Sequence, residues 1–255
     1  MNLPESIILG IIEGFTEFLP VSSTGHLILT STILNLKQAD FLKSFEIAIQ
    51  LGAVLSIVFL YWKSFLAERE TLKRVFAAFL PTAIGGIIFY KIFKNVLLEN
   101  SNIVLWALFS GGVFLIIFEL FYREKENSIE RISGLSYSKS FFIGAFQIIA
   151  MIPGLSRAAA TIIGGLALGL KRKTIVEFSF LLAVPTMLGA TVFDLVQNVN
   201  KFSFEQINFL VIGFIISFIT AILSVKFLLR FIKNHNFVIF GFYRIILAFL
   251  FWLII

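Results

Sequence analysis

EGFTEFLPVSSTGH, residues 13–26, interrupts an apolar region that extends from residue 7 to residue 34. Pro20 and the polar run from Ser22 to His26 divide this region into two halves. Each half is too short to cross a bilayer as a helix, which takes about 20 residues. Two short apolar segments around a polar break predict a re-entrant helical hairpin. We therefore expect a first hairpin over residues 7–34.

A second stretch, PGLSRAAAT at residues 153–161, interrupts the apolar region 141–170 in the same way and predicts a second hairpin. The two interrupted regions also resemble each other residue by residue. The aligned pairs are Gly10 with Gly144 and Glu13 with Gln147 and, after one residue of slip, Pro20 with Pro153 and Ser23 with Ser156. This similarity predicts a single membrane domain with an internal repeat, copy 1 at about 1–122 and copy 2 at about 136–255.

The composition excludes most classes of soluble protein. Of the 255 residues, 58% are hydrophobic and only 14% are charged, and the mean hydropathy is +0.96. A soluble globule of this size cannot hide so much apolar surface. The chain is therefore neither a soluble enzyme nor a disordered chain, and we expect no nucleic-acid partner despite the net charge of +6. The absence of cysteine excludes disulfides and thiolate metal sites.

The expected fold is an all-α integral membrane protein with six transmembrane helices and two re-entrant hairpins. The six apolar stretches that are long enough to span lie at 41–62, 73–93, 102–122, 174–195, 207–231 and 237–255. Each repeat then has one hairpin and three spans, so the second copy is inverted relative to the first. Inverted repeats with broken helices locate the binding site near the bilayer midplane.

The basic residues predict the orientation. Most of the 21 Lys and Arg residues fall on the side opposite the N-terminus, which is therefore expected to be cytoplasmic. Both termini would then face outward, with the first hairpin dipping in from the outside and the second from the cytoplasm. The N-terminal segment lacks the basic start of a cleavable signal peptide, so we expect the first apolar segment to be retained.

The first break carries candidate catalytic groups. Glu13 and Glu17 are four residues apart and share one helix face, where two like charges repel unless a cation or a proton lies between them. Carboxylate oxygens favour a hard divalent cation, and a shared proton is the alternative. His26 is a candidate acid/base or phosphate-contact group, or a hydrogen-bonded structural histidine. The neighbouring hydroxyl groups can cap the second half-helix and bind an anion at its N-terminus; they belong to Ser22, Ser23 and Thr24.

The second break predicts an anion pocket. Arg157 follows Pro153-Gly154 at the start of a half-helix, where a guanidinium, the Ser156 hydroxyl and free N–H groups can bind a phosphate. The alternative is that Arg157 neutralises a structural carboxylate such as Glu177. Four further charged residues in or near the spans are interpreted as structural: Glu46, Glu119, Asp194 and Arg244.

These two motifs, together with FEIAIQLG at 45–52 and EFSFLLAVPTMLGAT at 177–191, resemble the bacterial undecaprenyl pyrophosphate phosphatases of the bacitracin-resistance type. The resemblance covers essentially the whole chain. It implies hydrolysis of undecaprenyl diphosphate, which recycles the lipid carrier for peptidoglycan synthesis in the bacterial plasma membrane. It also implies an Mg²⁺ or Ca²⁺ cofactor, a homodimer and a site that opens to the outer face.

The resemblance assigns roles to particular residues. Glu13 and Glu17 correspond to the family's catalytic, metal-associated carboxylates, Ser23 to its motif serine and His26 to its motif histidine. Ser156, Arg157 and Thr161 correspond to its phosphate-binding motif, and together with the capping hydroxyls of Ser22 and Thr24 they form the expected substrate-binding set. The chain departs from the family pattern at Ala158 and Ala159, which replace a serine and a glycine.

The chemistry leaves two questions open at this stage. Either Ser23 or a water attacks the terminal phosphorus, with His26 or a carboxylate accepting the proton. The rival function is a polyisoprenyl-phosphate transporter or flippase, because inverted repeats with broken helices are also typical of secondary transporters. The pairing of carboxylates, a serine and a histidine with an arginine favours the hydrolase.

Overall fold

The computed structural model describes residues 1–36, 40–92, 101–198 and 204–254, and within these ranges the chain is helical without a β-strand. The first half contains α1 (Leu3–Thr16), α2 (Ser23–Ile33), α3 (Asp40–Leu60), α4 (Trp62–Ala67), α5 (Arg69–Ile92) and α6 (Ser101–Phe121). The second contains η2 (Ile132–Gly134), α7 (Tyr137–Ile149), α8 (Arg157–Ala167), α9 (Arg172–Asn198), α10 (Phe204–Phe231) and α11 (Val238–Ile254).

Four of the six expected spans are confirmed as helices long and apolar enough to cross a membrane. They are Phe41–Leu60, Arg69–Phe89, Asn102–Phe121 and Gln206–Phe231. The other two expected spans form helices without meeting that standard. The α9 helix begins with Arg172 and Lys173 and contains Glu177, and α11 has 17 residues, which is about 25 Å of helix. The described structure thus supports a multi-pass membrane protein with four clear spans.

Both interrupted regions consist of two short helices around a non-helical turn, and their caps match. The N-cap residues Asn2 and Ser136 of the first helices, and Ser22 and Ser156 of the second helices, are separated in each case by 134 residues. Ser22 and Ser156 both have φ of 72°. Gly10 and Gly144 obey the same spacing, but the turn pairs Ser22 rather than Ser23 with Ser156.

The helices pack in a reciprocal pattern. α1 packs on α10 and α7 packs on α5, while α3 contacts α9 and α6 contacts α11. Glycines make the first two contacts close: a Cβ on Gly10 would lie 2.7 Å from the Gly213 carbonyl oxygen, and one on Gly144 would lie 1.8 Å from that of Ala78. The first half therefore holds the hairpin of the second half, and the second half holds that of the first.

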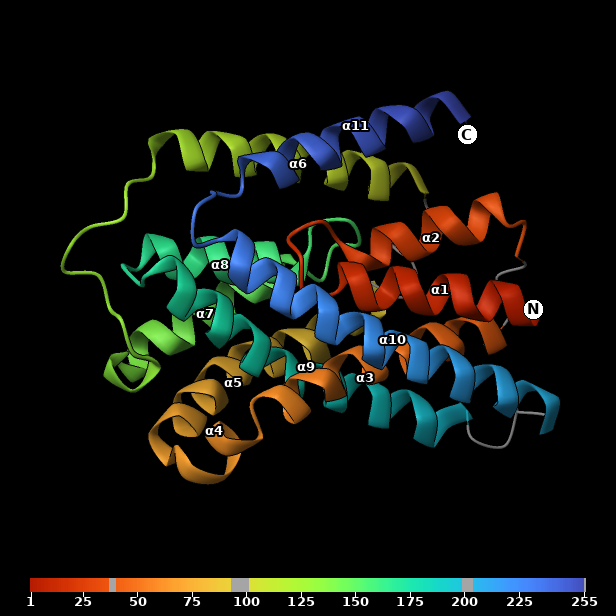
Figure 1. The fold of residues 1–255 in the computed structure, drawn as a ribbon, viewed down its shortest axis with the longest axis horizontal. Coiled ribbons are helices and arrows are strands. Elements are labelled where there is room, and N and C mark those ends of the chain that lie inside the picture. The colour runs from red at the N-terminus through yellow and green to blue at the C-terminus, as the bar shows by residue number, and fades with distance from the viewer. Residues whose placement is uncertain (37–39, 93–100, 199–203, 255) are drawn as a thin grey trace.

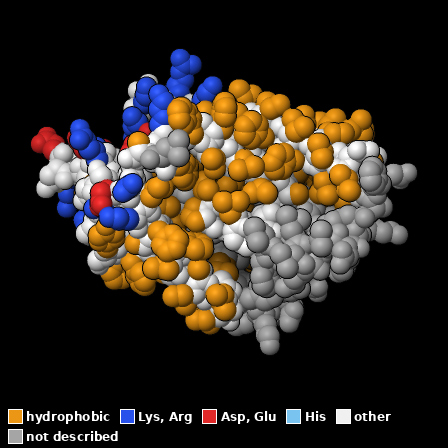
Figure 2. All heavy atoms as spheres, turned by 90° about the horizontal axis from the view of Figure 1, so that it is seen from below, with side chains coloured by type: hydrophobic (Ala, Val, Ile, Leu, Met, Phe, Trp, Pro, Cys, Tyr) orange, Lys and Arg blue, Asp and Glu red, His pale blue; other side chains and the backbone are white. Residues whose placement is uncertain are grey.

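The two hairpins enter the molecule from opposite ends. In Figure 1, α1 and α2 lie toward the end that carries both termini, α7 and α8 lie toward the other end, and the turns within the hairpins come together near the middle. Figure 2 shows a broad apolar flank with basic side chains gathered at one end. This distribution of side chains fits a protein whose flank faces lipid.

Candidate functional site

Glu17 lies at the point where the two breaks meet. It is the C-cap of α1, since its backbone N–H still bonds the Glu13 carbonyl, and Pro20, which has no N–H, follows three residues later. Its carboxylate accepts a hydrogen bond from Ser23 Oγ at 2.5 Å. It also forms an ion pair with the Arg157 guanidinium at 3.2 Å. All three side chains are largely buried. A carboxylate, a hydroxyl and a guanidinium from both hairpins thus form one cluster, hereafter the Glu17 cluster.

Arg157 is held by α9 as well as by Glu17. One terminal nitrogen donates to the Ser179 carbonyl at 2.8 Å, and the Thr161 hydroxyl lies 2.6 Å from the Ser179 hydroxyl. The Nε of Arg157 is buried, and it has no hydrogen-bond partner among the residues that the structure describes. The alternative pairing with Glu177 is wrong, because Glu177 pairs with Lys173 at 3.9 Å.

Glu13 lies one helical turn before Glu17 and is fully buried. Neither of its carboxylate oxygens has a hydrogen-bond partner in the described structure. A buried carboxylate without a partner is costly, so it requires a proton or a cation. The aligned Gln147 in α7 is also buried, but its amide nitrogen donates to the Thr82 and Thr186 hydroxyls, each at 3.1 Å.

The donor chemistry fits a hard divalent cation. Glu13 offers two unpaired oxygens, and Glu17 lies on the same helix face. No cluster of three or more His, Cys, Asp or Glu residues is found in the part of the chain that the structure describes. Any such cation would therefore complete its shell with water and phosphate oxygens, which is the usual arrangement for Mg²⁺.

His26 lies in the first turn of α2 and bonds through both ring nitrogens. Nδ1 is 2.7 Å from the Ser22 carbonyl oxygen, which can only accept, so Nδ1 carries a proton. Nε2 lies 2.7 Å from the Tyr243 hydroxyl, and the two rings stack with an interplanar angle of 3°. Tyr243 was missed by the sequence reasoning, because no motif surrounds it and 217 residues separate it from His26.

The remaining candidates mainly cap the half-helices. Ser22 accepts a hydrogen bond from the Gly25 N–H, and Ser156 accepts one from that of Ala159. Thr24 is partly exposed and none of the described hydrogen bonds includes its side chain, whereas Ala158 is buried against the core. The first turns of α2 and α8, whose leading N–H groups precede these capped ones, thus begin beside the Glu17 cluster, at Ser23 and at Arg157.

The charged residues interpreted as structural are bound within the fold. Glu119 pairs with both terminal nitrogens of Arg172, and Glu46 accepts from the Ser31 hydroxyl at 3.3 Å. Arg244 is completely buried and bonds backbone carbonyls. The side chain of Asp194 lies outside the described part of the chain.

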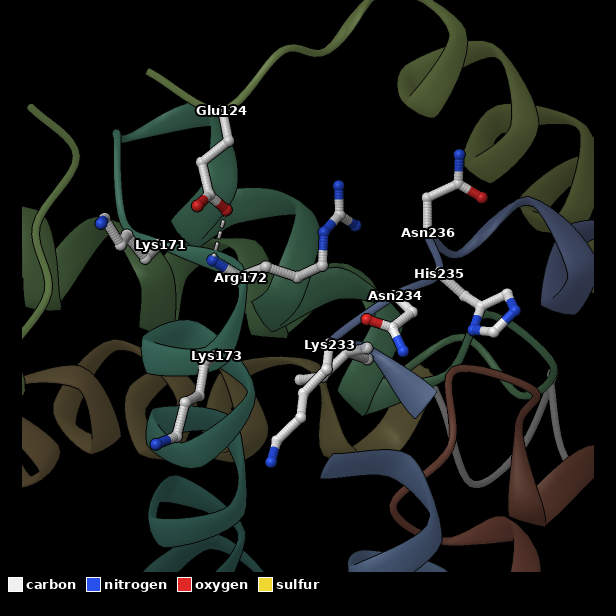
Figure 3. A pocket seen from close by; sticks show the side chains of 9 residues that line it. Glu124, Lys171, Arg172, Lys173, Lys233, Asn234, His235 and Asn236 are labelled. Atoms are coloured by element: carbon white, nitrogen blue, oxygen red, sulfur yellow. Dashed lines mark hydrogen bonds between the residues drawn. The ribbon is translucent and has the colours of Figure 1, made fainter. Parts of the chain in front are cut away.

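A cavity of about 410 Å³ lies elsewhere, between the start of α9 and the turn after α10 (Figure 3). Its cations are largely neutralised: Arg172 pairs with Glu119, and Lys171 lies 2.6 Å from Glu130. That contact lowers the pKa of Glu130 and raises the pKa of Lys171. The Glu124 carboxylate occupies the start of α9 by accepting the Arg172 N–H at 2.8 Å. These pairings leave little net charge to bind an anion.

The fold and the Glu17 cluster together define a class: a multi-pass helical membrane protein with a buried carboxylate–hydroxyl–guanidinium site where two broken helices meet. The model of the family described as "Bacitracin resistance protein BacA" matches residues 6–250, and the chain belongs to this family.

Three relatives carry the name undecaprenyl-diphosphatase. The protein of Persephonella marina is 52% identical over 255 residues, all of both chains. That of Sulfurihydrogenibium sp. is 51% identical over 253 residues, 99% of each chain. That of Aquifex aeolicus is 50% identical over 244 residues, 96% of this chain and 95% of its own.

Proposed function

We propose that this chain hydrolyses undecaprenyl diphosphate to undecaprenyl phosphate and inorganic phosphate, and thereby recycles the lipid carrier for cell-wall synthesis and confers bacitracin resistance. The names of relatives at about half identity over the full length support this function. The observation that carries it is Glu17, which contacts both a serine hydroxyl and an arginine. A nucleophile, a base and an anion-binding group are the parts that phosphoryl transfer needs.

Arg157 and the two helix N-termini are proposed to hold the diphosphate. The unpaired Nε of Arg157 supports this role, because a buried donor without a partner is available to a phosphate oxygen. The α2 and α8 helices begin at Ser23 and Arg157, and each presents first-turn N–H groups and the positive end of its dipole. These donors would stabilise the negative charge that develops on the terminal phosphoryl group.

Ser23 is proposed as the nucleophile and Glu17 as its base. The 2.5 Å contact between Ser23 Oγ and Glu17 Oε2 supports transfer of the hydroxyl proton to the carboxylate. Ser23 Oγ then bonds to the terminal phosphorus, the bond to the bridging oxygen breaks, and undecaprenyl phosphate leaves with that oxygen. A water, deprotonated by a carboxylate, would release phosphate from the phosphoseryl group and restore the hydroxyl.

Two further groups support this step. Glu13 and Glu17 would hold Mg²⁺ or Ca²⁺, and a bound divalent cation neutralises charge on the transferring phosphoryl group. His26 is proposed to act through the backbone, because its Nδ1–H fixes the Ser22 carbonyl immediately before Ser23. Thr161 would hold Arg157 in place by way of Ser179.

The test is phosphate release from a C55 polyisoprenyl diphosphate in detergent, with and without EDTA. We expect EDTA to abolish release and Glu17→Gln, Ser23→Ala and Arg157→Ala to reduce it by about 10³-fold. Glu177→Gln is the matched control, because Glu177 is a partly buried helical carboxylate outside the cluster, and it should retain activity. A folded wild type that binds the lipid without releasing phosphate would overturn the hydrolase in favour of a transporter.

The nucleophile is tested separately. With substrate labelled at the terminal phosphate, rapid acid quench should trap label on the wild type and none on Ser23→Ala. Ser31→Ala provides the control, since Ser31 is a buried serine of the same helix that bonds Glu46. Label absent from the wild type at all quench times would assign the attack to water.

We also propose six spans, two re-entrant hairpins, outward termini, a homodimer and a site open to the outer face. The opposite entry of the hairpins and the basic end of the molecule support this orientation. Because the chain has no cysteine, single cysteines at Asn2 and at Lys125 would report the two sides through labelling with an impermeant reagent. Labelling of Lys125→Cys from outside intact cells would reverse the orientation.

A further inference from the structure

Arg244 joins both helix breaks to α6 through the backbone. Its terminal nitrogens donate to the carbonyl of Gly154 at 2.8 Å and of Leu155 at 3.1 Å, both in the second break, and to that of Pro20 at 3.5 Å in the first break. The α6 carbonyls complete the set, Ala107 at 3.1 Å and Leu108 at 3.3 Å. All five N–H groups of the guanidinium are thus used.

The surroundings of Arg244 are shaped for this one side chain. It is completely buried, and no ion pair links it to a carboxylate among the described residues. A Cβ on Gly111 of α6 would lie 2.1 Å from a terminal nitrogen of Arg244, so only glycine leaves room for the guanidinium there. A buried charge is costly, and a plain packing position would be filled by an apolar side chain.

The contacts of Arg244 end beside the Glu17 cluster. Pro20 lies between Glu17 and Ser23, and Gly154 and Leu155 precede the Ser156 cap and Arg157. The distance between Ser23 on one hairpin and Arg157 on the other therefore depends on how the two breaks are held together. The neighbouring Tyr243 bonds His26, so α11 contacts the first hairpin at a second point.

We propose that Arg244 is a positioning residue, which fixes the two helix breaks relative to each other so that Ser23 and Glu17 of one face Arg157 of the other. This role rests on the proposed hydrolase function for its kinetic consequence. The geometric part, one fixed distance between the hairpins, stands independently of the reaction.

The kinetic test compares Arg244→Lys and Gly111→Ala with the wild type, as phosphate release per folded molecule. Lysine keeps the charge but has three donors and no planar fork. Alanine at residue 111 displaces the guanidinium without altering it. Both variants should lose about 10²-fold in kcat with KM changed far less, as expected for misplacement by about 1 Å.

Two matched controls separate positioning from stability. Arg74→Lys alters another largely buried arginine, which donates to the Leu135 carbonyl and to the Glu70 carboxylate, and neither partner belongs to a break or to α11. Gly189→Ala alters a helical glycine with no atom within 4 Å of the added Cβ. Both should keep kcat per folded molecule within about twofold, even where Arg74→Lys lowers the melting temperature.

The geometric test uses spin labels at Ile33→Cys and Ala167→Cys, the exposed last residues of α2 and α8. We expect one narrow distance distribution with Arg244, and a broad or shifted one with Arg244→Lys and with Gly111→Ala. Unchanged kcat in folded Arg244→Lys, or an unchanged distance distribution, would overturn the proposal. If the wild type releases no phosphate, the hydrolase function fails and the distance measurement alone decides the role of Arg244.

Discussion

The break between α1 and α2 and the break between α7 and α8 have the same backbone and different chemistry. In each, a serine with φ of 72° caps an 11-residue helix. At the next position the first break has Ser23 and the second has Arg157. In the helix before each break, the aligned buried residues Glu13 and Gln147 differ in their hydrogen bonds. Among the described residues, Gln147 donates from its amide nitrogen to two threonine hydroxyls and leaves its Oε1 unpaired, whereas neither carboxylate oxygen of Glu13 has a partner.

This comparison shows what the fold requires and what the site requires. The serine caps and the close glycine contacts occur in both halves, so they belong to the fold. The carboxylates occur in one half and the arginine in the other, so the cluster forms only when the halves are packed together. Buried polar atoms without a partner in the described structure occur in both halves, and two sets of them, the Glu13 carboxylate oxygens and Arg157 Nε, are the atoms proposed above to bind a cation and the diphosphate.

The largest loss of stability and activity is expected when the ion pair between Glu17 of the first half and Arg157 of the second is broken. Arg157→Met leaves Glu17 buried without its cation, which should destabilise the protein by about 3–5 kcal/mol and reduce activity about 10³-fold. The double variant Glu17→Gln with Arg157→Met should recover most of the stability and none of the activity. Thermal unfolding in detergent measures the stability of both variants, and phosphate release measures their activity. Recovery of activity in the double variant would contradict a catalytic role for the pair.

Exchanging the buried polar groups should separate stability from activity. Glu13→Gln gives the first half the residue of the second, and we expect a higher melting temperature, loss of the EDTA response and about 10²-fold lower activity. The reverse exchange, Gln147→Glu, adds a charge at a buried site and should lower the melting temperature without any new activity. Glu13→Gln with full, EDTA-sensitive activity would exclude Glu13 as a metal ligand.

The reciprocal helix contacts predict unequal tolerance of alanine. Gly144→Ala would bring a Cβ to 1.8 Å from the Ala78 carbonyl oxygen, whereas Gly10→Ala would bring one to 2.7 Å from that of Gly213. Both should destabilise by about 1–3 kcal/mol, with the larger loss at Gly144. Melting temperatures of the two variants in the same detergent give the order. A larger loss at Gly10 would show that α5 yields to α7 more easily than α10 yields to α1.

The smallest effect is expected where the half-helices end. Asn35 and Gly169 occupy equivalent left-handed positions, with φ of 51° and 87°. Gly169→Ala adds a Cβ with no atom within 4 Å, so its cost is backbone strain alone, about 1 kcal/mol. Asn35→Ala should cost less, because asparagine already carries that Cβ. A Gly169→Ala variant as stable as the wild type would show that this turn relaxes to another conformation.

Local sequence patterns predicted the two helix breaks, which the structure confirms as turns between short helices. Pro20 and Pro153-Gly154 marked both breaks, and the polar residues around them include Glu17, Ser23 and Arg157, which the structure brings together. Helix breaks and caps depend on a few neighbouring residues, so they can be recognised without the tertiary fold. The family resemblance was also correct.

The partners supplied by distant helices could not be predicted. Tyr243 and Arg244 lie in an apolar segment without a motif, and Ser179 contributes its carbonyl to Arg157 from α9. Arg244 was interpreted as a structural charged residue without a named partner, and its acceptors are backbone carbonyls, which carry no sequence signal. The alignment of Ser23 with Ser156 failed for a related reason, because residue identity favoured it and only the cap geometry distinguishes it from Ser22.

The position of Arg244 in α11 has a consequence for biosynthesis. Chains fold from the N-terminus as they leave the ribosome, and α11 is made after every helix that it fastens. Both hairpins can insert while the breaks between their helices are still free to move. The chain would then become able to hydrolyse its substrate only when α11 packs against the rest of the molecule. A nascent or truncated chain that contains all the residues of the Glu17 cluster but lacks α11 would be inactive in the membrane.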